Sequence, residues 1–270
     1  MQNKGKNKKP IEPVRKPIIQ GSWHGKDAWK LARGRGFTML ALTFFYLIAG
    51  ILLTMESLWA RVLACVAVVG AAFYYLYISG LAQGQTDAAF GEILHDRRAS
   101  GHDIPKDECE RSFHPLKGWF AVAIGAIPFV LFALVFALMT RPVTYRLGAL
   151  PAWTEGLMHQ TEFGAGLGYY LNQPGMSALD VMRIIVRAMI MPFVNVAVAL
   201  GTDVGLWAER LSPLLVLIAP MGYGFGYGQG LNYRVKVNTG IKLGDDKKKR
   251  KERKARKQRQ RSAKGPEQLI

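Results

Sequence analysis

Cysteine and acidic residues are both scarce in this sequence. Its two cysteines, Cys65 in an apolar stretch and Cys109 in a polar one, are not expected to pair, which excludes a disulfide-stabilised framework. Against 36 Lys and Arg there are only 19 Asp and Glu, so the formal net charge is +17. Such an excess predicts an anionic partner, either lipid headgroups or nucleic acid.

Recognisable catalytic and cofactor motifs are also missing. No Ser/His/Asp arrangement, nucleotide-binding loop, metalloprotease helix or pair of catalytic carboxylates is found among the apolar segments. The metal-capable residues His95, His102, Cys109 and His114 are spaced by seven, seven and five residues, which matches no zinc pattern. We therefore predict a protein that is not an enzyme and binds no cofactor, with these four side chains in a solvated loop.

Long apolar runs dominate the middle of the sequence. A run of about 20 apolar residues is long enough to cross a bilayer as a helix. The sequence predicts an all-α, polytopic membrane protein with a transmembrane domain at 36–233, between a basic, mostly disordered tail at 1–35 and a basic tail at 234–270. The predicted spans are 37–54, 60–81, 118–140 and 211–229, with a polar loop at 82–117 containing a short helix at 87–98, and an outer segment at 141–210.

The distribution of Lys and Arg predicts the orientation, because these residues are retained on the cytosolic side when they flank a span. Ten of them in residues 1–35 and fifteen from Arg234 onward place both ends in the cytosol, which requires an even number of spans. A fifth apolar stretch, 181–200, contains Arg183 and Arg187, and each arginine at the centre of a span costs about 2.5–3.5 kcal/mol. We therefore predict an amphipathic, interfacial or re-entrant helix there. The alternative is five spans with the N-terminus outside.

The helix after Ser177 carries the first candidate site. Ser177 and Asp180 match a capping box, and Asp180, Arg183, Arg187 and Asn195 then recur on one face of an otherwise apolar helix. In one interpretation the helix lies at the headgroup boundary with its arginines reaching lipid phosphates and Asp180 bridging Arg183. In the other, the stripe lines a polar groove that receives an anionic substrate or a nascent chain.

A glycine-rich run in the last span is the second candidate. Gly222, Gly226 and Gly230 recur at intervals of four, and Gly224 with Gly228 forms a second row. Such rows allow helix backbones to approach closely, so we predict a helix-packing face. The alternative is an unwound region that lines a pathway. The spacing is not that of a dinucleotide-binding fingerprint.

The third candidate is the C-terminal tail, which holds twelve Lys/Arg between Lys247 and Lys264. Near an anionic leaflet each basic residue contributes about 1 kcal/mol, which favours a lipid-surface anchor. Contact with RNA, such as a ribosome docked at the membrane, is the alternative. The expected contact residues are Lys247, Lys248, Lys249, Arg250, Lys251, Arg253 and Lys254.

Two segments, Leu217-Ile-Ala-Pro-Met-Gly-Tyr-Gly-Phe-Gly-Tyr-Gly228 and Gly84-Gln-Thr-Asp-Ala-Ala-Phe-Gly-Glu-Ile-Leu94, resemble a group of multi-pass membrane proteins of Gram-positive anaerobic bacteria. The resemblance implies a bacterial plasma membrane and no particular activity. The layout alone is similar to that of membrane-protein insertases of bacteria and mitochondria, whose sequence signature is missing. We predict a non-enzymatic membrane subunit or scaffold that packs against partner membrane proteins or a second copy of itself. The alternative is a transport or insertion component with an arginine-lined groove.

Overall fold

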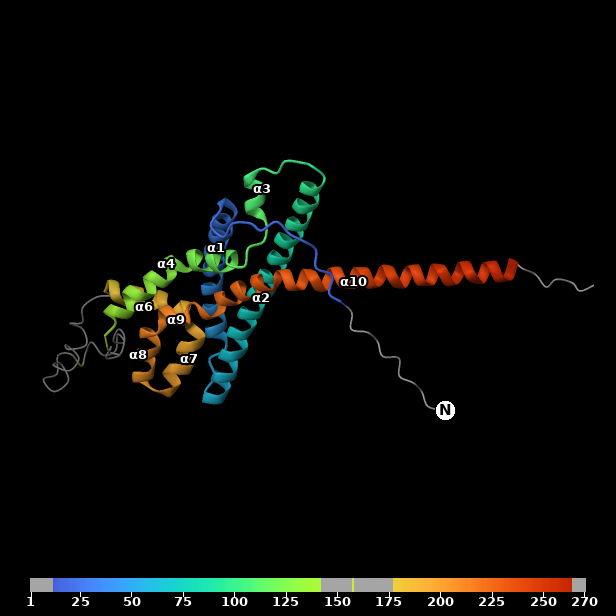
Figure 1. Cartoon of the computed structure of the whole chain (residues 1–270). Coiled ribbons are helices and arrows are strands. Elements are labelled where there is room, and N and C mark those ends of the chain that lie inside the picture. The colour runs from blue at the N-terminus through green and yellow to red at the C-terminus, as the bar shows by residue number, and fades with distance from the viewer. Residues whose placement is uncertain (1–11, 142–156, 158–176, 264–270) are drawn as a thin grey trace, which may run out of the picture. The chain divides into compact units, whose positions relative to one another are not determined.

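The computed structural model describes residues 12–141, 157 and 177–263, and within these residues the chain is helical and contains no strand (Figure 1). The predicted all-α membrane class is therefore confirmed. In chain order the described helices are α1 (Lys26–Leu52), α2 (Leu58–Ala99), α3 (Lys106–Arg111), α4 (Lys117–Met139), α6 (Ala178–Met189), α7 (Met191–Leu200), α8 (Thr202–Arg210), α9 (Ser212–Leu215) and α10 (Ile218–Ala263).

Three of these helices, α1, α2 and α4, are long and apolar enough to cross a membrane. Their apolar character comes from uninterrupted runs, and α4 accommodates Pro128 within its 23 residues. Two more candidate spans are bent. The axes of α6 and α7 differ by 103°, and the helical segments Asp203–Arg210 and Ser212–Arg259 differ by 61°. The described residues thus provide three clear spans and up to five when each bent pair counts as one.

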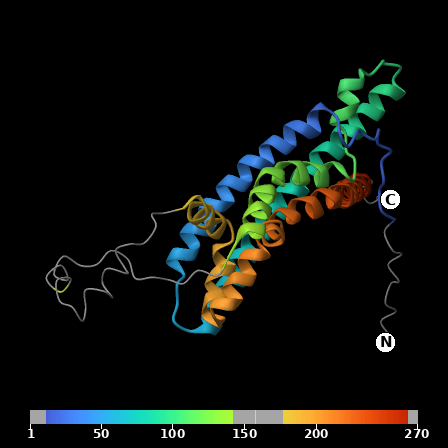
Figure 2. The same cartoon turned by 90° about the vertical axis from the view of Figure 1, so that its left-hand side faces the viewer.

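The stretch 181–200 is divided between two helices, so Asp180 and Asn195 do not lie on one continuous helix. The chain breaks at Ile190, and α7 begins at Met191 with Pro192 in its first turn (Figure 2). Proline lacks the backbone N–H for the bond to residue i−4 and its ring crowds that carbonyl, so a continuous helix through Pro192 is disfavoured. A sharp bend at this point agrees with the predicted re-entrant segment and also with a broken span.

Two other boundaries differ from the expectation. The short helix predicted at 87–98 is the end of α2, which runs for 42 residues to Ala99. Inside the segment predicted as the basic N-terminal tail, α1 begins at Lys26. Ahead of α1 the backbone N–H of Ile19 donates to the Gly91 carbonyl at 3.3 Å, and that of Gly21 donates to the Phe113 carbonyl at 3.1 Å.

The chain divides into two compact units. The first comprises residues 1–31, 76–121 and 223–270, and the second comprises residues 32–75 and 122–222. In the second unit a core of buried residues joins α1, α4, α6, α7 and the segment before α10, and partly buried aromatic side chains of α4 pack against it. The buried members of this core are Met39, Ala126, Met189, Ile190, Val194 and Val216.

Candidate functional site

The basic C-terminal run forms the end of α10. We call residues 244–263 the basic arm; it is helical throughout, and its described side chains are exposed from Gly244 to Arg259. All seven predicted contact residues, Lys247 to Lys254 without Glu252, lie in it. Successive residues of a helix are about 100° apart. The ten Lys/Arg between positions 247 and 259 therefore point in every direction around the axis.

A buried polar junction holds α10 just before the arm. Glu92 of α2 accepts hydrogen bonds from the guanidinium of Arg234 at 3.0 and 3.1 Å and from the amide of Asn238 at 2.7 Å. Glu92 and Asn238 are both buried. At the next residue, the Thr239 hydroxyl accepts a hydrogen bond from the backbone N–H of Val14 at 2.9 Å. These contacts tie the helix to α2 and to the N-terminal segment before the arm begins.

A second buried junction lies in the same unit. The Lys117 ammonium, at the start of α4, pairs with Asp87 of α2 at 3.3 Å and donates to the carbonyl oxygen of Arg111 at 3.0 Å. The Tyr227 hydroxyl of α10 donates a hydrogen bond to Asp87 Oδ2, the same oxygen that pairs with Lys117, at 2.6 Å. The Tyr227 ring stacks on Phe113 with a centroid separation of 5.4 Å. Asp87 and Lys117 are almost completely buried. Removing either charge would therefore leave the other one buried without its ionic partner.

The predicted glycine faces are used within the chain. A Cβ at Gly226 would collide with the carbonyl oxygen of Tyr77, and one at Gly230 would collide with the backbone of Gly84. In the second unit, a Cβ at Gly222 would lie 2.5 Å from the carbonyl oxygen of Phe73. The first row therefore forms a close backbone contact with α2, where Gly80 and Gly84 supply the matching small residues.

The two glycines of the second row differ in their surroundings. A Cβ at Gly224 would lie 2.7 Å from the Trp119 ring of α4, whereas one at Gly228 would meet no atom within 4 Å. The helix-packing interpretation thus describes four of the five glycines, Gly222, Gly224, Gly226 and Gly230. The run is helical throughout, so the alternative of an unwound region is wrong.

The two arginines of α6 share one carboxylate, that of Glu209 in α8. The Arg183 Nε donates to Glu209 at 3.2 Å and the Arg187 Nε donates to it at 2.6 Å. The Thr140 hydroxyl at the end of α4 also donates to Glu209, at 3.0 Å. Glu209 is 2% exposed and Arg183 is 7% exposed, so this is a buried charge cluster.

The remaining members of the predicted stripe are separated from one another. Asp180 completes the capping box with Ser177, as predicted, and its exposed carboxylate lies 3.8 Å from Arg183. Asn195 lies beyond the break at Ile190, where its side-chain amide donates to the Gly50 carbonyl at 2.8 Å. Arg183 and Arg187 are thus balanced by Glu209 and Asp180, which leaves no excess positive charge among these four side chains.

Sequence reasoning missed the acidic partners Glu209, Asp87 and Glu92. Each lies more than twenty residues from the cation it binds, and no local spacing connects the two. One signal was present, since a lone acidic residue beside an apolar run is costly to bury without a partner. The metal-capable residues His95, His102, Cys109 and His114 form no cluster of three or more potential ligands in the part of the chain that the structure describes.

No protein-family model matches this chain, and no curated protein or solved structure is significantly similar to it.

Proposed function

We propose that this protein is a non-enzymatic membrane scaffold subunit that presents the basic arm to an anionic partner in the cytosol. The observation that carries the proposal is the continuity of α10, a single helix from Ile218, in its apolar part, to Ala263 at the end of the arm. Within that helix the arm continues the axis of the segment that packs on α2. The arm therefore extends in the direction of that segment, beyond the contacts of α10 with α2 and with the N-terminal segment.

The distribution of charge on the arm supports a partner in solution. Helices that lie on a bilayer have an apolar face that inserts and a basic face that meets the headgroups. Between Asp245 and Arg261 the only apolar residue is Ala255, and basic side chains surround the helix. Lying flat on a leaflet would bring only about half of these charges near phosphate groups. An acidic protein surface or RNA that surrounds the helix would engage more of them.

The membrane part supplies the anchor. Only 17% of the apolar window of α1 and 17% of that of α2 is buried within the chain. The exposed remainder of both windows is available to contact lipid, a partner membrane protein or a second copy of this chain. The glycine faces, in contrast, are occupied by contacts within the chain, so the intermolecular surface of the proposed scaffold is the outer side of α1 and α2.

A matched pair of charge-neutralised variants tests the proposal. In one, Lys247, Lys248, Lys249 and Arg250 of the arm are changed to Gln, which has a similar helix propensity. In the other, Lys4, Lys6, Lys8 and Lys9 are changed to Gln, which removes the same four charges from the opposite end of the chain. Partners are captured from membranes of the native host in mild detergent, at low and moderate salt.

We expect the arm variant to lose a soluble partner that the unaltered chain and the N-terminal variant both retain. Flotation with anionic vesicles measures lipid binding by the same three proteins. If the arm variant loses vesicle binding and no soluble partner, the arm is a lipid anchor and the proposal is wrong.

A further inference from the structure

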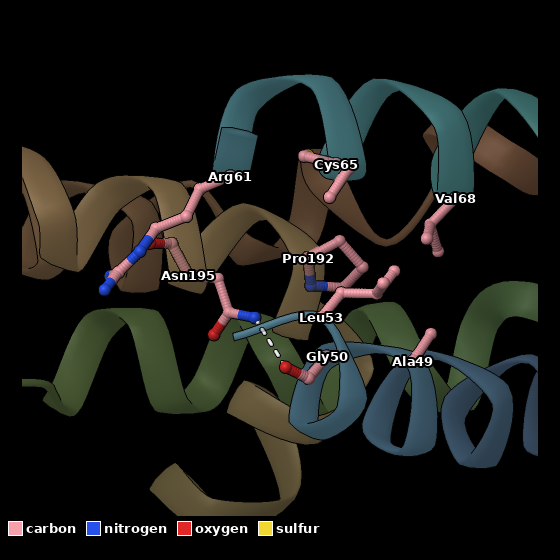
Figure 3. A pocket seen from close by; sticks show the side chains of 9 residues that line it. Ala49, Gly50, Leu53, Arg61, Cys65, Val68, Pro192 and Asn195 are labelled. Carbon is pink, nitrogen blue, oxygen red and sulfur yellow. Dashed lines mark hydrogen bonds between the residues drawn. The ribbon is translucent and has the colours of Figure 1, made fainter. Parts of the chain in front are cut away.

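A small pocket lies in the second unit, between the end of α1, the start of α2 and α7 (Figure 3). Its wall is apolar and includes Leu53, Ala64, Val68 and Pro192. Arg61 and Asn195 line its polar end. None of these residues belongs to the basic arm or to the charge cluster at Glu209.

Arg61 differs from the arginines of α6 in having no carboxylate partner within the described residues. Its guanidinium donates from Nε to the carbonyl oxygen of Met55 and from a terminal nitrogen to that of Asn195 at 3.4 Å. A guanidinium has five N–H donors, so three remain for a ligand. The nearby Glu56 is exposed and forms no ion pair with Arg61 among the described contacts. The charge of Arg61 is therefore uncompensated.

The pocket lies at the ends of two candidate spans, next to the connection between α1 and α2. Arg61 lies in the first turn of α2, directly after the connection from α1. Large apolar side chains around it face outward, including Leu52 at 76%, Trp59 at 78% and Leu63 at 70% exposure. Exposed apolar surface of this kind on a span is covered by lipid chains, with Trp at the headgroup level.

We propose that this pocket is a binding site for an anionic phospholipid. The phosphate would accept hydrogen bonds from the free N–H groups of Arg61, whose planar fork matches phosphate oxygens. The glycerol end of the acyl chains would lie against the wall formed by Leu53, Ala64 and Val68. No acidic side chain lines the pocket to receive the ammonium group of a zwitterionic headgroup. The apolar wall distinguishes a lipid from free phosphate, which offers the same charge without an apolar part.

The test measures the thermal unfolding midpoint of the full-length chain in a neutral detergent, after delipidation. Short-chain phosphatidylglycerol, short-chain phosphatidylcholine and inorganic phosphate are added separately. High salt is used throughout, because it weakens the binding of lipid to the fully exposed basic arm more than binding to a half-buried arginine. We expect phosphatidylglycerol to raise the midpoint by several degrees and the other two ligands to leave it unchanged.

Two variants locate the effect. Arg61→Gln removes the charge, and Ala64→Leu fills the pocket while leaving Arg61 in place. Both should lose most of the shift, whereas Arg61→Lys should retain part of it, and the arm variant with four Gln should retain all of it. The site is wrongly assigned if Arg61→Gln and Ala64→Leu respond like the unaltered chain. An equal response to phosphatidylcholine or to inorganic phosphate would also overturn the anionic phospholipid as its ligand.

Discussion

Glu209 is the residue on which the buried charge cluster of α6, α8 and α4 depends. Its carboxylate accepts from Arg183, Arg187 and Thr140. Removing one partner from a buried ion pair typically costs about 3–5 kcal/mol, because the remaining charge stays desolvated. We therefore expect Glu209→Gln to lower the thermal unfolding midpoint strongly in detergent. Glu56→Gln, at an exposed position, is the control and should melt like the unaltered chain. Equal midpoints for both variants would show that the cluster is solvated.

The environment of His114 predicts how the stability of the folded protein depends on pH. Burial, followed by the neighbouring charges of His24 and Lys117, lowers the pKa of His114 below its ordinary value. Its Nδ1 also accepts a hydrogen bond from the backbone N–H of Leu116 at 3.2 Å, which requires that nitrogen to be unprotonated. The unfolded chain therefore binds this proton more tightly than the folded chain does, so protonation favours unfolding. The stabilising effect of neutral His114 is present above the unfolded pKa of about 6.5 and is lost as the pH falls below it.

The measurement is the unfolding midpoint between about pH 8 and about pH 5, for the unaltered chain and for His114→Gln. We expect the unaltered chain to lose more stability on acidification than the variant, since Gln does not titrate. Other titrating groups act equally on both proteins. Identical pH profiles would contradict the role given to His114.

At the scale of elements, the contact between α2 and α10 is very close and leaves no space for an added side-chain atom. A Cβ at Gly226 would overlap the Tyr77 carbonyl oxygen, a backbone atom that cannot rotate away. We expect Gly226→Ala to separate the helices and to cost about 1–3 kcal/mol, as overpacking does elsewhere. Gly228→Ala is a matched control two residues away on the same helix, where the added methyl meets nothing within 4 Å. Thermal melts of the two variants should differ clearly, and a harmless Gly226→Ala would mean that the helices are not in close contact.

The helices also show which structural features can be predicted from the sequence and which cannot. The capping box at Ser177 and the glycine row of α10 were predicted because both follow from spacing within one helix. The partners of these features were not predicted. Glu209 lies in another helix from Arg183, and Gly84 of α2 meets Gly230 of α10 although the two are far apart in the sequence. Pairings of this kind depend on which helices pack together. The spacing of residues within a single sequence does not indicate these partners.

For the molecule as a whole, the number of crossings determines where the ends lie. Four spans place both ends on the same side of the membrane, and five place them on opposite sides. We expect single cysteines introduced at the exposed Gln20 and at Ser262, in a chain with Cys65 and Cys109 changed to Ser, to react with a maleimide only when it reaches the cytosolic side. A cysteine at Glu56, in the connection between α1 and α2, should react only from the other side. Labelling of positions 20 and 262 from opposite sides would require an odd number of spans, three or five.

The length of α10 beyond Thr239 determines which charges set the electrostatic potential around the basic arm. At about 1.5 Å per residue, Arg259 lies roughly 30 Å along the helix from Thr239. At physiological ionic strength the potential of a charge decays over about 8 Å, so the far end of the arm is several screening lengths from the junction. In the proposed arrangement, with the arm directed into the cytosol, the potential there depends on the arm's own side chains and hardly on the leaflet. The rate at which the arm captures an oppositely charged molecule should thus be insensitive to lipid composition, while remaining steeply sensitive to ionic strength.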